Sequence, residues 1–101
     1  IYKEKPVLNT DIIGEVAKKT ELPLAMHGGS GISDEQYREV IGKGIVKINY
    51  YSYMAYEGYR KAKEIVEKKD ADFFHVISRG AEDAMYENVL RTMKVFCGVN
   101  L

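Results

Sequence analysis

A short apolar segment that leads directly into a glycine-rich loop is the feature that most constrains the fold of this chain. Residues 22–26, Leu-Pro-Leu-Ala-Met, form a continuous apolar run, and His27-Gly28-Gly29-Ser30-Gly31 closes it. An apolar run of this length that ends in glycines is typical of a strand buried on both faces of a parallel sheet. We therefore predict a strand over residues 22–26, followed by a tight loop.

The residues after this loop predict a helix and then a second strand. Ser33 stands three residues before Gln36, which is the spacing of a capping box, and apolar residues recur at helical intervals until Gly42. Residues 45–49, Ile-Val-Lys-Ile-Asn, are rich in β-branched side chains. Because parallel strands are joined by crossovers, strand, loop, helix and strand form one right-handed unit.

Helical patterns flank this unit on both sides. Asn9 or Thr10 can cap a helix that ends near Thr20, and Ser52 can cap another that is broken at residues 68–70. A last amphipathic helix, with apolar residues from Ile77 to Phe96, ends at Gly98. The pattern predicts parallel α/β architecture, and two strands need further strands from outside this chain to close a barrel.

Charge and cysteine usage exclude several classes of function. The chain has 101 residues, with 15 Lys and Arg against 15 Asp and Glu, so its formal net charge is zero. Neither nucleic acid nor an anionic membrane is an expected partner for such a surface. The single cysteine, Cys97, cannot form an internal disulfide, and no apolar run has the length of a membrane span. We expect a cytoplasmic protein in which Cys97 is a small buried side chain.

The glycine loop carries the strongest chemical signal. Glycines let backbone amides approach an anion, and Ser30 adds a hydroxyl donor, so the loop can hold phosphate or can be a ligand-free turn. His27 shares a strand face with Ala25, which leaves room beside it for a metal or substrate. The alternative is a histidine held by one backbone carbonyl. A catalytic zinc needs about three protein ligands, and His75 is the only other histidine.

Asn49-Tyr50-Tyr51-Ser52 follows the second strand at the equivalent height. An amide and a hydroxyl ahead of a helix N-terminus can bind an oxyanion, so two neighbouring loops are expected to converge on one ligand. Ser52 can instead be a simple helix cap. Lys47, on the face of Asn49, is expected to be buried and either to form an ion pair or to react as an amine. The tyrosines from Tyr50 to Tyr59 are expected in packing or an interface.

The stretch PLAMHGGSGISDEQYREVIGKGIVKIN, continued by NYYS, resembles class II, metal-dependent ketose-bisphosphate aldolases of the fructose- and tagatose-bisphosphate kind. The resemblance covers essentially the whole chain and is sharpest over residues 23–52. It implies that residues 1–101 are the C-terminal part of a single (β/α)8 TIM-barrel domain, with its last two strands, their helices and a C-terminal helix.

The resemblance also implies a role for individual residues. His27 becomes a zinc ligand, Gly28 and Ser30 hold the phosphate of dihydroxyacetone phosphate, and Asn49 contacts the bound ketose. The predicted substrate and phosphate contacts are Gly28, Gly29, Ser30, Asn49, Tyr50, Tyr51 and Ser52. The other metal ligands and the general acid would lie upstream of this chain, so no catalytic acid is assigned to it and the isolated chain is expected to be inactive.

The implied reaction is reversible aldol cleavage of a ketose 1,6-bisphosphate, with fructose 1,6-bisphosphate as the leading candidate. The implied enzyme is a dimer or tetramer that uses Zn²⁺ or another divalent metal. Two departures leave the substrate open. Tyr51 stands where many fructose-bisphosphate aldolases have Asp, and residues 73–75, Phe-Phe-His, replace an Asp-Pro-Arg segment. The alternatives are a phosphate-binding or degenerate paralogue without catalysis, and a purely structural piece that associates through its strand edges.

Overall fold

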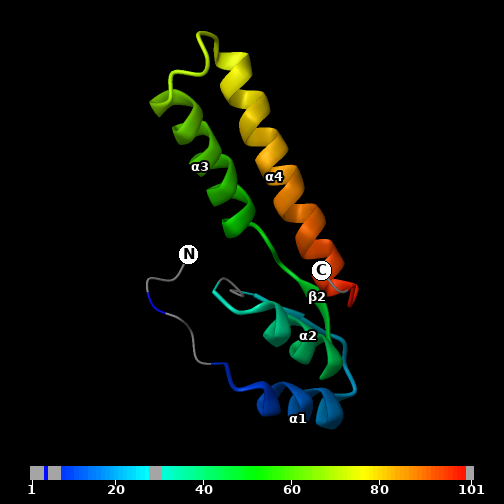
Figure 1. Ribbon diagram of the computed structural model, residues 1–101. Coiled ribbons are helices and arrows are strands. Elements are labelled where there is room, and N and C mark those ends of the chain that lie inside the picture. The colour runs from blue at the N-terminus through cyan, green and yellow to red at the C-terminus, as the bar shows by residue number, and fades with distance from the viewer. Residues whose placement is uncertain (1–3, 5–7, 28–30, 100–101) are drawn as a thin grey trace. The chain divides into compact units, whose positions relative to one another are not determined.

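The computed structural model describes residue 4, residues 8–27 and residues 31–99. The predicted order of helices and strands is confirmed (Figure 1). The elements are α1 (Thr10–Thr20), β1 (Leu24–Met26), α2 (Asp34–Gly42), β2 (Ile45–Ile48), α3 (Ser52–Glu67) and α4 (Phe74–Phe96). The chain divides into two compact units, Ile1–Tyr50 with Lys94–Leu101 and Tyr51–Met93.

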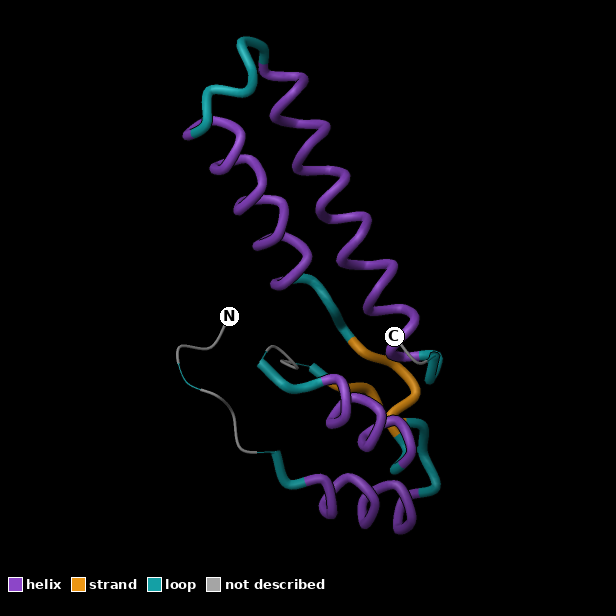
Figure 2. The backbone as a smooth tube through the Cα atoms, in the orientation of Figure 1, coloured by secondary structure: helices purple, strands orange, loops and turns teal. Residues whose placement is uncertain are grey.

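The two strands of the first unit form a parallel pair (Figure 2). Leu24 pairs with Ile45, whereas Ala25 pairs with Lys47, so the register shifts by one residue between these two pairs. Such an irregularity gives one strand an extra residue, which here is Val46, and Val46 is 71% exposed. The shift allows Ile45 to join the core although Lys47, two residues later, faces away from it.

One face of the strand pair carries the hydrophobic core of the first unit. Val40 of α2 is fully buried, and the rings of Tyr37 and Phe96 lie 4.9 Å apart between centroids. Fully burying a side chain of this size contributes about 1.5 to 3 kcal/mol. The buried residues of this core are Met26, Tyr37, Val40, Ile45 and Val95.

The opposite face of the strand pair is exposed, which corrects the prediction of a first strand buried on both faces. Ala25 and His27 are exposed in and after β1, and Lys47 and Asn49 are exposed in and after β2. The predicted burial of Lys47 is therefore wrong for this structure. The physical reason is that α1, α2 and the last residues of α4 pack on the other face, so this one borders solvent.

α2 begins and ends at signals that the sequence contains. The capping box is formed, because the Gln36 N–H donates to Ser33 Oγ at 3.2 Å and the Ser33 N–H donates to Gln36 Oε1 at 2.8 Å. After α2, Gly44 has φ of 125°, and a Cβ there would lie 2.7 Å from Ala17 Cβ. Glycine is therefore required where β2 passes α1.

A polar cluster joins α1 to the end of α2. Lys43 Nζ lies 2.7 Å from Thr10 Oγ1 and 3.0 Å from Asp11 Oδ1, and the Thr10 hydroxyl donates to Glu39 Oε1 at 2.6 Å. The Thr10 hydrogen bond, followed by Lys43, lowers the pKa of Glu39, and the hydrogen bond to Asp11 raises the pKa of Lys43. The helical spacing of Glu39 and Lys43 was the only part of this cluster that the sequence could signal.

The second unit is an antiparallel pair of helices, α3 and the larger part of α4, which lie side by side in Figure 1. Gly58, in the first half of α3, faces Met85 of α4. Ile65, near the end of α3, faces Gly80, near the start of α4, so the two helices run in opposite directions. A Cβ on Gly58 would lie 2.9 Å from Met85 Cγ, which shows how closely the helices pack. No helix in the described residues is both long enough and apolar enough to cross a membrane.

Candidate active site

The site begins where the two strands end. β1 ends at Met26 and β2 at Ile48, these two residues are register partners, and the Asn49 N–H donates to the Met26 carbonyl at 3.0 Å. The residues that follow, His27 and Asn49, consequently start from the same level of the sheet. In parallel sheets, ligands bind outside the carboxyl ends of the strands. The equal height predicted for the two strand ends is confirmed, and the convergence of the two loops on one ligand stays a prediction.

The side chains of His27 and Asn49 are in contact. Asn49 Nδ2 lies 2.6 Å from His27 Nδ1 and 3.2 Å from His27 Nε2. Both residues are exposed on the strand face that carries Ala25 and Lys47. An imidazole and an amide can therefore approach one ligand from neighbouring strands, with the small side chain of Ala25 beside them.

The glycine loop is described only at its ends. Gly28, Gly29 and Ser30 lie outside the described residues, so their predicted phosphate contacts stay predictions. Gly31 has φ of 90°, a backbone conformation that favours glycine, and the chain then enters α2 through the Ser33 cap. The loop thus leads from His27 to a helix N-terminus, where backbone N–H groups favour an anion.

Residues 50–52 have unequal environments. Tyr50 is half-buried, and its ring meets Phe96 edge to face at 6.1 Å, so Tyr50 covers the core of the first unit. Tyr51 is 69% exposed and occupies the N-cap position of α3, without a side-chain cap bond. Ser52 is the first residue of α3, which corrects the alternative that Ser52 is the cap. Tyr51 and Ser52 belong to the second unit, and their ligand contacts stay predictions.

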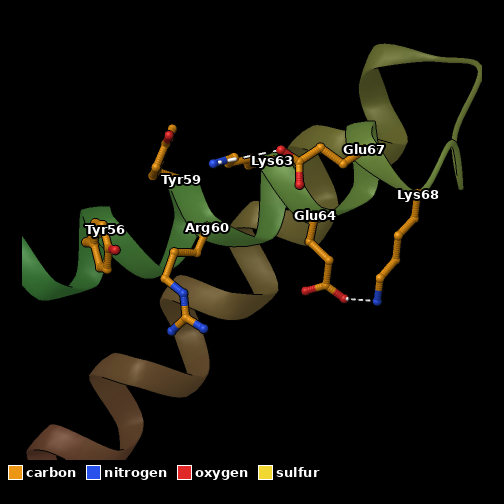
Figure 3. A pocket seen from close by; sticks show the side chains of 7 residues that line it. All are labelled: Tyr56, Tyr59, Arg60, Lys63, Glu64, Glu67 and Lys68. Carbon is orange, nitrogen blue, oxygen red and sulfur yellow. Dashed lines mark hydrogen bonds and ion pairs between the residues drawn. The ribbon is translucent and has the colours of Figure 1, made fainter.

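Tyr56 and Tyr59 of α3 border a shallow groove on the surface of this helix (Figure 3). The rings of Tyr56 and Tyr59 lie 6.1 Å apart and tilted by 34°, and both residues are exposed. The charged side chains beside them pair with each other, Lys68 with Glu64 at 3.0 Å and Lys63 with Glu67 at 3.8 Å. These pairs indicate a solvated helix face, and Tyr56 and Tyr59 are not core residues.

The described residues offer one ligand of the predicted metal site. His27 supplies an exposed imidazole, which is a suitable donor for a divalent cation. No group of three His, Cys, Asp or Glu side chains that could hold a metal lies together within residues 8–27 and 31–99. His75 lies in the second unit, stacked on Phe73 at 5.9 Å. Cys97 is exposed, so its predicted burial is wrong; it lies just beyond the last residue of α4.

Comparison with known proteins gives a consistent result over the whole chain. The family described as fructose-bisphosphate aldolase class-II matches residues 1–100. The sulfofructosephosphate aldolase of Alkalicoccus urumqiensis is 34% identical over 101 residues, which are 99% of this chain and 35% of that protein. The fructose-bisphosphate aldolase of Mycoplasma pneumoniae is 42% identical over 66 residues, covering 64% of this chain and 23% of that one.

The crystal structure of the YdjI aldolase from Escherichia coli K12 has the same fold over this stretch. It superposes with a TM-score of 0.81 at 30% identity, covering 95% of this chain and 35% of that structure. This confirms the predicted fold, part of an aldolase (β/α)8 barrel. The chain spans about a third of the length of the relatives from Alkalicoccus urumqiensis and Escherichia coli. On the evidence of its fold, its strand-end residues and its match over residues 1–100, the chain belongs to the class II fructose-bisphosphate aldolase family.

Proposed function

We propose that this chain supplies one metal ligand and the phosphate-binding corner of a metal-dependent aldolase. The enzyme would cleave a ketose 1,6-bisphosphate into dihydroxyacetone phosphate and glyceraldehyde 3-phosphate. Fructose 1,6-bisphosphate is the leading candidate for this substrate. The observation that carries the proposal is the contact of His27 with Asn49 at the carboxyl ends of β1 and β2. Two strand ends that present an imidazole and an amide to the same point form the start of a polar ligand site.

In this proposal His27 binds Zn²⁺ or another divalent cation, and the remaining ligands come from outside the described residues. The bound cation would polarise the ketose carbonyl as a Lewis acid. Asn49 would hold a ketose oxygen through its amide, because it lies on the same exposed face as His27. The general acid is assigned to no residue of this chain, so we expect the chain by itself to be inactive.

The phosphate would be held by the glycine loop and by the start of α3. Gly28 and Ser30 would donate backbone and hydroxyl hydrogens, with Gly29 shaping the loop. Ser52 would add its hydroxyl at the N-terminus of α3, where the helix dipole favours an anion. Tyr50 and Tyr51 would line the same corner from the segment between β2 and α3. Lys47 is exposed on the His27 face and stays a candidate for an ion pair there.

Relatives with different substrates favour a second candidate. The relative from Alkalicoccus urumqiensis, which aligns over 101 residues, is named a sulfofructosephosphate aldolase. Tyr51 also replaces the Asp that many fructose-bisphosphate aldolases have, which removes one acidic contact to the substrate. Cleavage of a sulfonated ketose phosphate is therefore the alternative reaction. A cytoplasmic location and assembly into a dimer or tetramer complete the proposal, with neither nucleic acid nor membrane as a partner.

The test uses the two histidines as a matched pair in the protein that carries this chain. Its aldol cleavage is measured with fructose 1,6-bisphosphate and with sulfofructosephosphate, before and after complete metal removal. We expect His27→Ala to lower kcat/KM at least about a hundredfold, whereas His75→Ala should stay within a factor of about two, because His75 is an exposed surface residue of the second unit.

Two outcomes would contradict the proposal. Cleavage that survives complete metal removal would exclude the metal-dependent mechanism. No cleavage of either sugar by a folded protein with metal would favour the alternative of a phosphate-binding paralogue without catalysis. Preference for the sulfonated sugar would keep the reaction type and change the substrate.

A further inference from the structure

One aromatic ring at the end of α4 contacts two segments that border the candidate site. The ring of Phe96 lies 4.9 Å from that of Tyr37 and 6.1 Å from that of Tyr50, measured between ring centroids. Tyr37 belongs to α2, and Tyr50 directly follows Asn49. The two pairs are inclined by 57° and 87°, within the range of geometries that aromatic rings prefer. Phe96 is therefore the middle ring of a chain of three in the first unit.

The last residues of α4 hold Phe96 in place. Val95, directly before it, is only 1% exposed and belongs to the core of the first unit. After it, the Gly98 N–H donates to the Val95 carbonyl at 3.0 Å, and Gly98 has φ of 76°, so a left-handed glycine closes the helix. Arg38 of α2 then donates from Nη2 to the Val99 carbonyl at 2.9 Å. The ring is thus fixed by burial before it in sequence and by α2 after it.

The chain of rings ends at the neighbour of a candidate site residue. The Asn49 N–H continues the strand ladder by donating to the Met26 carbonyl at 3.0 Å. Asn49 is exposed on the face that carries His27, whereas Tyr50 is half-buried against Phe96. Because successive side chains of an extended chain point in opposite directions, holding the Tyr50 ring also fixes the direction in which the Asn49 amide points.

We propose that Phe96 is a positioning residue that sets the direction of the Asn49 side chain through Tyr50. This inference rests on the proposed contact of Asn49 with the bound ketose. The ring pair with Tyr37 ties Phe96 to α2, which begins at the Ser33 cap. Phe96 therefore holds the end of β2 at a fixed place relative to α2, and a ligand that contacts Asn49 depends on that place.

The first experiment measures the position of Asn49 without ligand, metal or activity. In NMR spectra of the protein that carries this chain, a nuclear Overhauser effect is expected between the Asn49 side-chain amide and the carbon-bound ring hydrogens of His27, since Asn49 Nδ2 lies 2.6 Å from His27 Nδ1. Phe96→Leu removes both ring contacts and should weaken this effect. Phe96→Tyr keeps the ring and should preserve it.

The second experiment measures cleavage of fructose 1,6-bisphosphate and of sulfofructosephosphate by the same proteins. For the sugar that is cleaved, Phe96→Leu should raise KM about fivefold and leave kcat within a factor of about two, because it weakens the holding of the ligand equally before and during the reaction. Phe96→Tyr should restore KM. If Phe96→Leu does not fold, Phe96→Met takes its place, since Met fills similar space without a ring.

Val95→Ala is the matched control for loss of packing at the same helix end. Val95 lies in the same core and next to Phe96 in sequence, and it takes part in neither ring pair. The change should lower the urea midpoint at least as much as Phe96→Leu does, but leave KM and the Overhauser effect unchanged. An equal rise of KM in Val95→Ala would show that any loosening of the core disturbs the site, and would overturn the positioning role.

These outcomes separate the inference from the proposed function. An unchanged Overhauser effect in Phe96→Leu removes the positioning role, whatever reaction the protein catalyses. A weakened effect with an unchanged KM also overturns the inference, because the direction of Asn49 would then not matter to the ligand. A weakened effect in a protein that cleaves neither sugar removes the proposed reaction and supports the control of Asn49 by Phe96.

Discussion

The two faces of the β1–β2 pair share one backbone but differ in their side chains and in their roles. On the core face, Met26 and Ile45 are buried against α2, where Val40 is fully buried. On the other face, His27 and Asn49 are exposed and contact each other through polar atoms. One face therefore contributes apolar burial to stability, and the other presents groups that can bind a ligand.

The comparison shows that a residue of the core and a residue of the candidate site can be adjacent in the chain. Met26 and His27 are neighbours in sequence, yet one is in the core and the other in the candidate site. The alternation of side chains along a strand makes this possible, and the register Met26–Ile48 extends it to the second strand. Changes on the core face should alter folding, whereas changes on the exposed face should alter binding.

The largest effect is expected from the core face. Val40→Ala removes two methyl groups from a fully buried side chain and should cost about 2 to 3 kcal/mol of unfolding free energy. Lys47→Gln on the exposed face should change it by less than about 0.5 kcal/mol. The free energy of unfolding of both variants is measured from hydrogen exchange of the Asn49 backbone N–H at increasing urea concentration. Equal losses in the two variants would contradict the division between the faces.

A somewhat smaller effect is expected where β2 begins. Gly44→Ala would place a Cβ 2.7 Å from Ala17 Cβ at φ of 125°, so the change should cost about 2 kcal/mol. Gly42→Ala is the matched control, because a Cβ there meets nothing within 4 Å and alanine favours the helix. The same exchange measurement applies. If Gly44→Ala also lowers the aldol cleavage of the protein that carries this chain, both faces depend on this one turn.

The cap of α2 should contribute less. Ser33→Ala removes the oxygen that accepts from the Gln36 N–H and should cost about 1 kcal/mol. Ser33→Thr keeps a capping hydroxyl and should recover most of this loss. Thermal or urea unfolding of the three proteins compares them. A cost for Ser33→Thr as large as that for Ser33→Ala would mean that the hydroxyl is not what matters.

The smallest effect is expected at the polar cluster of Thr10, Glu39 and Lys43. Because Glu39 has its pKa lowered below 4.5, its contribution is present above that value and is lost as the pH falls through the lowered pKa. Because Lys43 has its pKa raised above 10.5, its contribution is present below that value and is lost as the pH rises through the raised pKa.

The pH test removes the main cause of the Glu39 shift. Thr10→Val should flatten the acid limb of the urea midpoint plotted against pH, since Glu39 loses the hydroxyl that lowers its pKa. Thr20→Val is the control, because that hydroxyl donates to the Val16 carbonyl within α1. An acid limb that is the same in both variants would show that the cluster does not contribute to stability.

Much of the fold could be predicted because its signals are local. The Ser33–Gln36 spacing predicted the start of α2, and the apolar runs predicted both strands within one or two residues. The equal height of His27 and Asn49 also followed, since both directly succeed parallel strands. The glycine loop at residues 28–30 was the strongest sequence signal, and it stays a prediction.

Other features depend on contacts between distant residues. The burial predicted for Lys47 and Cys97 is wrong, because periodicity identifies a face of a strand or helix but not what covers it. The link of Lys43 to Thr10 and Asp11 spans 33 and 32 residues of sequence, and no short-range pattern signals it. Exposure and long-range pairing are decided when elements pack.

The sequence by itself determined the order of helices and strands, the family and the residue types at the strand ends. These follow from periodicity, capping and turn chemistry, which act over a few residues. Only the tertiary structure decided the register shift at Val46, the face on which Ile45 lies and the contact of Asn49 with His27. The physical reason is that register is set by the packing of two strands against a shared core, which neither strand encodes alone.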